Sequence, residues 1–249
     1  MLLVSLMLAA APVDLKELEA AEPSVRYAAS RRLSASGAGA VPALTAALDS
    51  PRPLLRAMAA HALAGFGQQE QAKLAWSALP KLELLVVKDA DAKVRSSVAR
   101  ALGLLSRELP AAQLRKAVTA LGGALQDADG EVRSSAAMAL AVLDPTSGDA
   151  AAALGAALQR PEPVGSNLHQ EACFRLETMG AAAKRGVPGL VALLKSDDED
   201  LRATALESLT KLGPVAVDAA PALEALVKTA QGTEARSVAS ALKAVRQRK

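Results

Sequence analysis

The sequence predicts an all-α fold in which helix hairpins stack side by side into an α-solenoid. Two segments, residues 89–105 and 127–143, are identical at eleven of seventeen positions and lie 38 residues apart. Internal repeats of this length are typical of solenoids, because stacked units bury a core that one unit cannot bury alone. Hydrophobic residues make up 51% of the 249 residues, but aromatic residues only 2%. The core must therefore be built from small aliphatic side chains, and the abundant alanine favours helix.

A recurring Val-Arg pair places one helix in each repeat. Around the third copy, Val94, Val98, Leu102 and Leu105 are spaced by four, four and three residues, which puts them on one face of a helix. The repeats are separated by 30, 39, 38, 36, 33 and 34 residues when they are measured at the arginine or its equivalent: Arg26, Arg56, Arg95, Arg133, His169, Arg202 and Arg236.

Start and stop signals bound these first helices. An acid stands four residues before several of the arginines, where it suits the positive end of a helix: Glu22, Asp91, Asp129 and Asp198. Pro23 and Pro53 fit the first turn, where a missing N–H does no harm. Glycines follow the apolar stretches as predicted C-terminal stops: Gly37, Gly67, Gly180 and Gly213.

A second helix completes each unit. Four of these helices are expected to open at Pro42, Pro80, Pro188 and Pro221, over residues 40–48, 78–86, 186–194 and 219–227. Two more, near 111–125 and 149–159, lack the proline but keep the helical spacing. The sequence thus predicts about six helix pairs and a terminal helix.

Residues 1–13 form an apolar leader, and residues 14–249 are expected to form a single solenoid. The leader is too short to span a membrane. It resembles a signal peptide without the usual basic start. A signal peptide, a lipid-facing anchor and an apolar cap on the first repeat all stay open, and with them both a cytoplasmic and an exported location.

Charge and cysteine content point to no special chemistry. The formal net charge is +3, and the cations are mixed with acids except at the C-terminal Arg246, Arg248 and Lys249. This balance does not indicate a nucleic-acid-binding chain. Cys173 is the only cysteine, so we expect a buried thiol and no internal disulfide.

The pattern D-x-D-x-x-V-R-x-x-A-x-x-A-L, followed by Gly and A-V-P-x-L-x-x-L-L, resembles the HEAT repeat in its short, phycocyanobilin-lyase-type form. The resemblance covers roughly residues 22–247 and implies a right-handed solenoid. It also implies a ladder in which the arginine of one repeat pairs with an acid of a neighbour. The candidates are the arginines Arg26, Arg56, Arg95, Arg133, Arg202 and Arg236, with the acids Asp89, Asp127 and Asp197. His169 interrupts the series and marks either a kink or sequence drift.

Enzymes with HEAT-like repeats are disfavoured by the residues present. A di-iron site needs several imidazole and carboxylate ligands, and the chain has only His61 and His169. A DNA-glycosylase-like protein needs a cationic concave face and aromatic residues for stacking. A bilin lyase would place aromatic and cationic side chains around its pigment, and no specific motif for it is found.

We therefore expect a non-enzymatic, monomeric protein–protein interaction scaffold that needs no cofactor or metal. It would bind a peptide or helix of another protein along its concave face. The second helices are expected to line that face with small side chains, such as Ala43 and Thr45. The sequence does not identify the partner or the contacting residues, and a surface that binds nothing stays open. Nucleic-acid binding is the main alternative, favoured if the cations outside the ladder gather on the concave face.

Overall fold

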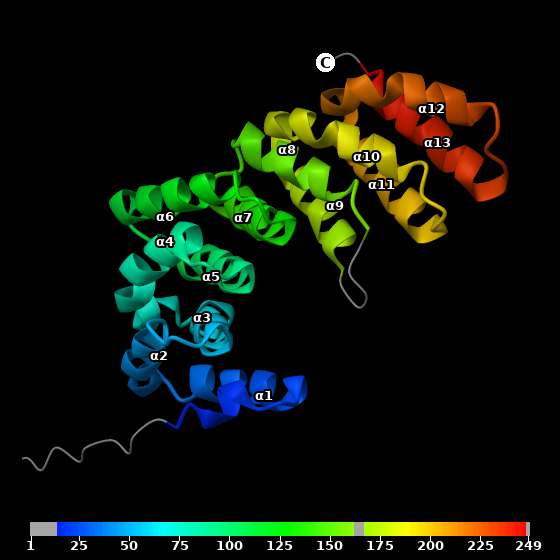
Figure 1. Ribbon diagram of the computed structural model, residues 1–249. Coiled ribbons are helices and arrows are strands. Elements are labelled where there is room, and N and C mark those ends of the chain that lie inside the picture. The colour runs from blue at the N-terminus through cyan, green and yellow to red at the C-terminus, as the bar shows by residue number, and fades with distance from the viewer. Residues whose placement is uncertain (1–13, 162–166, 248–249) are drawn as a thin grey trace, which may run out of the picture.

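The computed structural model describes residues 14–161 and 167–247, and every regular element in these ranges is helical. The expected leader 1–13 lies outside the described residues. The first helices of the units follow the Val-Arg repeat (Figure 1). They are α1 (Pro23–Ala35), α3 (Pro53–Gln68), α5 (Ala92–Leu105), α7 (Gly130–Leu143), α9 (Leu168–Thr178), α11 (Glu199–Leu212) and α13 (Gly232–Val245).

The second helices complete six hairpins within the described ranges, and α13 stands as the terminal helix. They are α2 (Val41–Ala47), α4 (Leu79–Lys88), α6 (Ala111–Ala124), α8 (Gly148–Ala157), α10 (Val187–Leu193) and α12 (Ala220–Val227). Short 3-10 segments precede α1, α2, α4, α10 and α12: η1 (Lys16–Glu19), η2 (Ala38–Ala40), η3 (Ala72–Ala78), η4 (Gly180–Gly186) and η5 (Gly213–Ala219). The predicted right-handed α-solenoid is confirmed.

Aspartate caps fix where three of the first helices begin. The Asp91 carboxylate accepts hydrogen bonds from the backbone N–H groups of Lys93 and Val94, at 2.8 and 3.2 Å. Asp129 and Asp198 cap α7 and α11 in the same way. These bonds satisfy N–H groups that have no partner inside the helix. Glu22 makes no such bond at the start of α1.

Three of the four glycines that were predicted to end helices do so, and one does not. Gly37, Gly180 and Gly213 have φ of 80°, 54° and 54°, a left-handed backbone that favours glycine. Gly67 instead lies inside α3, so its prediction as a stop was wrong. A Cβ atom at Gly67 would lie 2.6 Å from the carbonyl oxygen of Leu104. This glycine therefore serves the close approach of α3 to α5.

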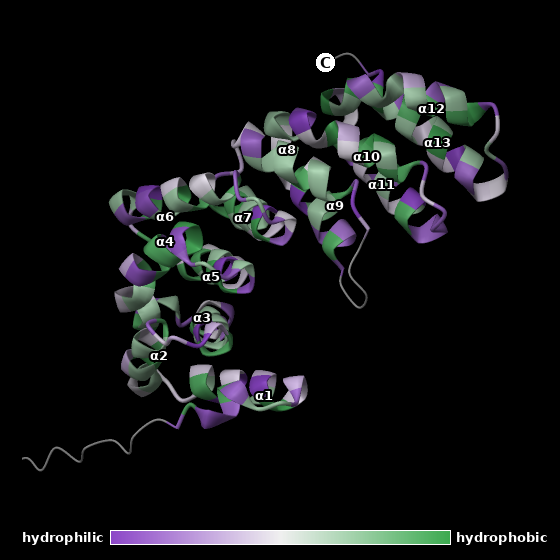
Figure 2. Ribbon diagram, in the orientation of Figure 1, coloured by the Kyte–Doolittle hydropathy of each residue, from purple (hydrophilic) through white to green (hydrophobic). Residues whose placement is uncertain are grey.

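Small residues let the helices of neighbouring units pack closely. A Cβ at Gly103 of α5 would lie 2.7 Å from the Ala139 Cβ of α7, and one at Gly65 would lie 2.5 Å from the Ser34 hydroxyl. The continuous core is mostly leucine, valine and alanine. Hydrophilic residues gather at helix ends and in loops (Figure 2).

The solenoid is curved, and the first helices line its inner side. In Figure 1, α3, α5, α7 and α9 face the hollow of the arc, and α2, α4, α6 and α8 form its outer edge. The expectation that the second helices line the concave face was therefore wrong. Helical spacing shows that each helix has an apolar face, but not which layer of a hairpin lies inside the curve. Ala43, Thr45 and their counterparts in later units belong to the outer layer.

The arc consists of two limbs. The elements up to α7 run along one limb and those from α8 to α13 run along the other, so the bend lies between α7 and α8, within the fourth unit (Figure 1). The side chain of Arg160, just past α8, donates to the carbonyl of Gly130 and the hydroxyl of Ser134, at 2.8 and 2.6 Å. It therefore ties the loop after α8 to α7.

Candidate functional site: an arginine ladder and a concave groove

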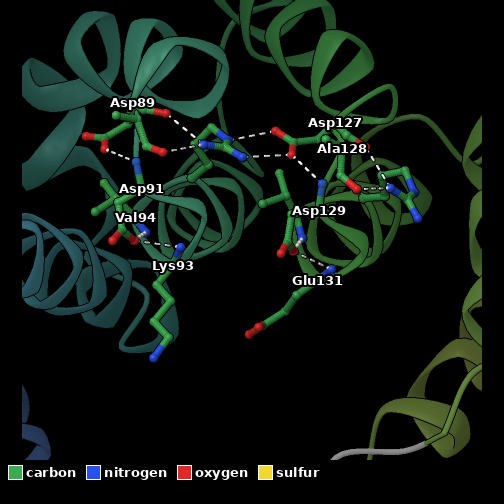
Figure 3. Close-up of polar contacts among 12 residues, drawn as sticks. Asp89, Asp91, Lys93, Val94, Asp127, Ala128, Asp129 and Glu131 are labelled. Atoms are coloured by element: carbon green, nitrogen blue, oxygen red, sulfur yellow. Dashed lines mark hydrogen bonds and ion pairs between the residues drawn. The ribbon is translucent and has the colours of Figure 1, made fainter.

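Two consecutive rungs of an arginine ladder join the second, third and fourth units. Arg56 donates two hydrogen bonds to the Asp89 carboxylate, both at 2.7 Å. Arg95 donates two to Asp127, at 2.7 and 2.8 Å. Arg95 also donates to the carbonyl of Asp89 at 2.8 Å, so the row of bonds is continuous (Figure 3). Paired two-bond contacts of this kind fix geometry as well as charge.

The carboxylates of these rungs are almost fully buried. Side-chain exposure is 3% for Asp89 and 9% for Asp127. Burial works to raise the pKa of Asp89, but hydrogen bonds from Arg56 and from the N–H of Asp91 outweigh it, so this pKa is lowered. The hydrogen bond from Arg95 lowers the pKa of Asp127 despite burial. Both groups are therefore held as carboxylates by their partners.

A third rung uses an acid that the sequence did not indicate. Arg202 bonds to the side chain of Glu234, at 2.9 Å from Nε to Oε1. Asp197, the third acid proposed for the ladder, contributes only its backbone carbonyl, which accepts from Arg202 of its own unit at 3.2 Å. Asp89 and Asp127 stand six residues before the arginines of their units, whereas that position before Arg236 is Ala230. The longer glutamate side chain reaches Arg202 from the first turn of α13.

The remaining predicted arginines have no carboxylate partner among the described residues. Arg26 donates to the carbonyls of Ala20 and Ala21, and the matching acid position in the next unit is Ser50. Arg133 likewise donates to two carbonyls of its own unit, those of Asp127 and Ala128. Arg236 is exposed on α13.

His169 takes a different place from the arginines. It is buried, and its Nε2 lies 2.9 Å from the carbonyl oxygen of Arg160.

Within the described ranges no group of three or more potential metal ligands occurs, and none of the helices there has the length and apolar character to cross a membrane.

A groove of about 430 Å³ lies on the concave side and is lined by residues from the first-helix layer. Its apolar lining includes Leu104 of α5, Met138 and Val142 of α7, and Leu168 of α9. The first three are half-buried, so the groove presents an apolar strip that its own chain leaves partly uncovered. Such strips are common at protein-binding sites.

Charged groups border this apolar strip. Arg100 and Arg107 line the groove from the α5 side, and Glu131 lines it from the start of α7. At the α9 side Glu171 forms an ion pair with Arg175. Neither the Arg100 nor the Arg107 side chain has a hydrogen bond or ion pair to any described residue, and both are exposed.

Next to the groove, the concave face carries an aromatic and basic group. The Tyr27 and His61 rings meet edge to face with centroids 5.1 Å apart. Burial, Arg100 and Arg31 together lower the pKa of His61. Arg31 lies one helical turn after Tyr27 and is exposed, and its guanidinium has no ion-pair partner in the part of the chain described. The basic character of α5 thus extends toward α1.

Some of the cations outside the ladder are compensated by ion pairs. Eight of them pair with acids elsewhere in the chain: Arg32 with Glu17, Arg52 with Glu19, Lys73 with Glu108, Lys81 with Asp49, Lys184 with Asp218, Arg185 with Asp149, Lys211 with Glu177, and Arg246 with Glu224.

The aromatic side chains do not form a stacking platform. Trp76 is half-buried and donates to the carbonyl of Leu105 at 3.1 Å, and Phe66 is fully buried. Phe174 is exposed but has Arg175 over its ring at 5.6 Å. The single cysteine, Cys173, is buried.

The sequence matches a family model of HEAT repeats over residues 12–81, 79–165 and 165–243. The chain therefore belongs to the HEAT repeat family. No curated protein matches it in sequence.

Solved structures share the solenoid fold. An engineered protein is 23% identical, with 83% of this chain and 96% of that chain covered and a TM-score of 0.54. YibA of E. coli is 15% identical, with 94% and 91% covered and a TM-score of 0.57. A chain from a structure on the phosphorylation-controlled interaction between cadherin and β-catenin is 17% identical, with 93% and 52% covered and a TM-score of 0.53. Solenoids of this kind are commonly protein-interaction scaffolds.

Proposed function

We propose that this protein is a non-enzymatic scaffold that binds a peptide or helix of another protein along its concave face. The observation that carries the proposal is the groove between α5, α7 and α9, where Leu104, Met138 and Val142 offer a partly uncovered apolar strip. A curved surface built by successive repeats suits an elongated ligand. An apolar strip with polar borders is the usual make-up of a groove that takes an amphipathic segment.

The arginine ladder supports this role from inside the scaffold. Arg56 and Arg95 are bonded to carboxylates of the next unit and to backbone carbonyls, so their charges are compensated. They keep the units in register and thereby position the groove lining. In this proposal the ladder arginines are structural and do not bind phosphate.

Affinity capture from the native organism tests the proposal. The bait is the full chain, compared with the double variant L104Q/M138Q, which removes apolar contact from the groove. The matched control is L84Q/V87Q, since Leu84 and Val87 are exposed at 55% and 44% on α4 of the outer layer. We expect mass spectrometry to find one or more proteins retained by the native bait and by the control, but lost on L104Q/M138Q.

Partners that still bind L104Q/M138Q but no longer bind L84Q/V87Q would contradict a binding site on the concave face. Circular dichroism of each bait confirms that the variants remain folded. Nucleic-acid binding, the alternative expected from the fold family, would be favoured if the captured material were removed by nuclease.

A further inference from the structure

The basic side of the groove has a defined spacing. Arg100 and Leu104 are four residues apart and share one face of α5, and Arg107 lies in the turn that follows the helix. Arg100 and Leu104 are separated by roughly 6 Å along the helix axis. Leu104 lies between them and continues into the apolar strip.

The charges of these arginines are not balanced by the chain itself. Unpaired cations also occur in the outer layer, at Arg115 and Lys116 of α6, but there Glu83 lies close enough for Lys116 to act on its pKa against the effect of burial. Arg100 instead lies near His61, and together with burial it lowers the pKa of His61. Arg31 adds a further cation on the same side.

The acids of the groove stand apart from the α5 side. Glu171 is engaged by Arg175, which leaves Glu131, at the start of α7, as the one groove-lining acid without an ion pair in the described ranges. The lining therefore combines an apolar strip, a basic border on the α5 side and a single acid without an ion pair, Glu131, at the start of α7.

We propose that the groove recognises an acidic amphipathic segment of a partner protein. Its apolar side chains would pack on Leu104, Met138 and Val142, and two of its carboxylates would meet Arg100 and Arg107. This inference rests on the proposed function and adds the chemistry of the partner. Charge complementarity of this kind selects the partner and its orientation, and the apolar contact supplies most of the affinity.

A displayed library of random 16-residue peptides, selected on the immobilised full chain, tests the inference. Peptides that also bind L104Q/M138Q are subtracted. We expect the remaining pool to be enriched in Asp and Glu together with Leu, Ile, Phe or Met, and to carry net negative charge relative to the unselected library.

A synthetic peptide of the enriched consensus then measures the role of the arginines by fluorescence anisotropy. R100E/R107E is expected to weaken binding at least tenfold, because it replaces two attractions by two repulsions. R115E/K116E makes the same charge change in the outer layer, and its Kd should stay within twofold of the native value.

The outcomes separate this inference from the proposed function. Enriched peptides that are basic or uncharged, yet require Leu104 and Met138, would overturn the acidic partner and leave the peptide-binding scaffold standing. A pool with no groove-dependent peptide would overturn both. A 20-base-pair DNA duplex that binds more tightly than the consensus peptide, and loses binding on R100E/R107E, would replace the acidic segment by nucleic acid.

Discussion

The Arg95 guanidinium links three points of the fold. It bonds to the Asp127 side chain of the next unit and to the carbonyls of Asp89 and Ala90 in its own unit. The Asp89 side chain in turn holds Arg56 and the N–H of Asp91. One residue thus contributes to helix start, hairpin and stacking at once, which explains why the Val-Arg pair is the clearest repeat in the sequence.

Replacing Arg95 by methionine should destabilise the fold far more than an exposed pair would. R95M leaves Asp127 at 9% exposure without its partner, and breaking a buried pair in this way costs about 3 kcal/mol. The control R185M removes the exposed partner of Asp149 and should cost less than about 1 kcal/mol. Urea unfolding followed by circular dichroism measures both. Equal effects would contradict the role of the ladder.

The ladder also predicts an acid-sensitive fold. The pKa values of Asp89 and Asp127 are lowered in the folded chain, so their contribution is complete above the unfolded pKa of about 3.9 and is lost as pH falls through the folded values. We expect the free energy of unfolding to drop between about pH 5 and pH 2. The double variant D89N/D127N should be less stable at pH 7 and show a shallower drop. If the pH dependence of the free energy of unfolding is unchanged in this variant, other groups cause the drop.

At the scale of helices, most of the architecture could be predicted because its signals are local. Capping by Asp91, helix opening at prolines such as Pro80, and four–four–three apolar spacing all act within a few residues. The role of Gly67 was predicted wrongly because this glycine permits a close contact with α5, 37 residues away in sequence. Glu234 was missed because it reaches Arg202 from a position that the repeat does not mark.

The close approach of α8 and α10 gives a sharp test of helix packing. A Cβ at Gly189 would lie 2.1 Å from the carbonyl oxygen of Gly155, so G189A must push the two backbones apart. We expect a loss of roughly 1–3 kcal/mol in the free energy of unfolding. In G122A the new methyl meets no atom within 4 Å, and the helix should gain up to about 1 kcal/mol. Thermal and urea unfolding distinguish the two; a neutral G189A would show that α8 and α10 are not in such contact.

At the scale of the whole molecule, curvature decides which side chains are offered to a partner. The sequence could place helices, but not the layer that faces inward, because curvature depends on how neighbouring units tilt and pack. The groove residues Arg100, Met138 and Val142 were consequently not singled out by their sequence pattern. A signal was available in Arg100 and Arg107, which flank Leu104 without any acid at helical spacing.

The central claim is that the inner layer of first helices forms the partner-binding surface. Hydrogen–deuterium exchange of the full chain, with and without a captured partner or consensus peptide, tests it most directly. We predict slower exchange on binding in residues 97–107 and 131–142, with 79–88 and 111–124 of the outer layer unchanged. Protection confined to the outer-layer segments, with the inner ones unaffected, would contradict it.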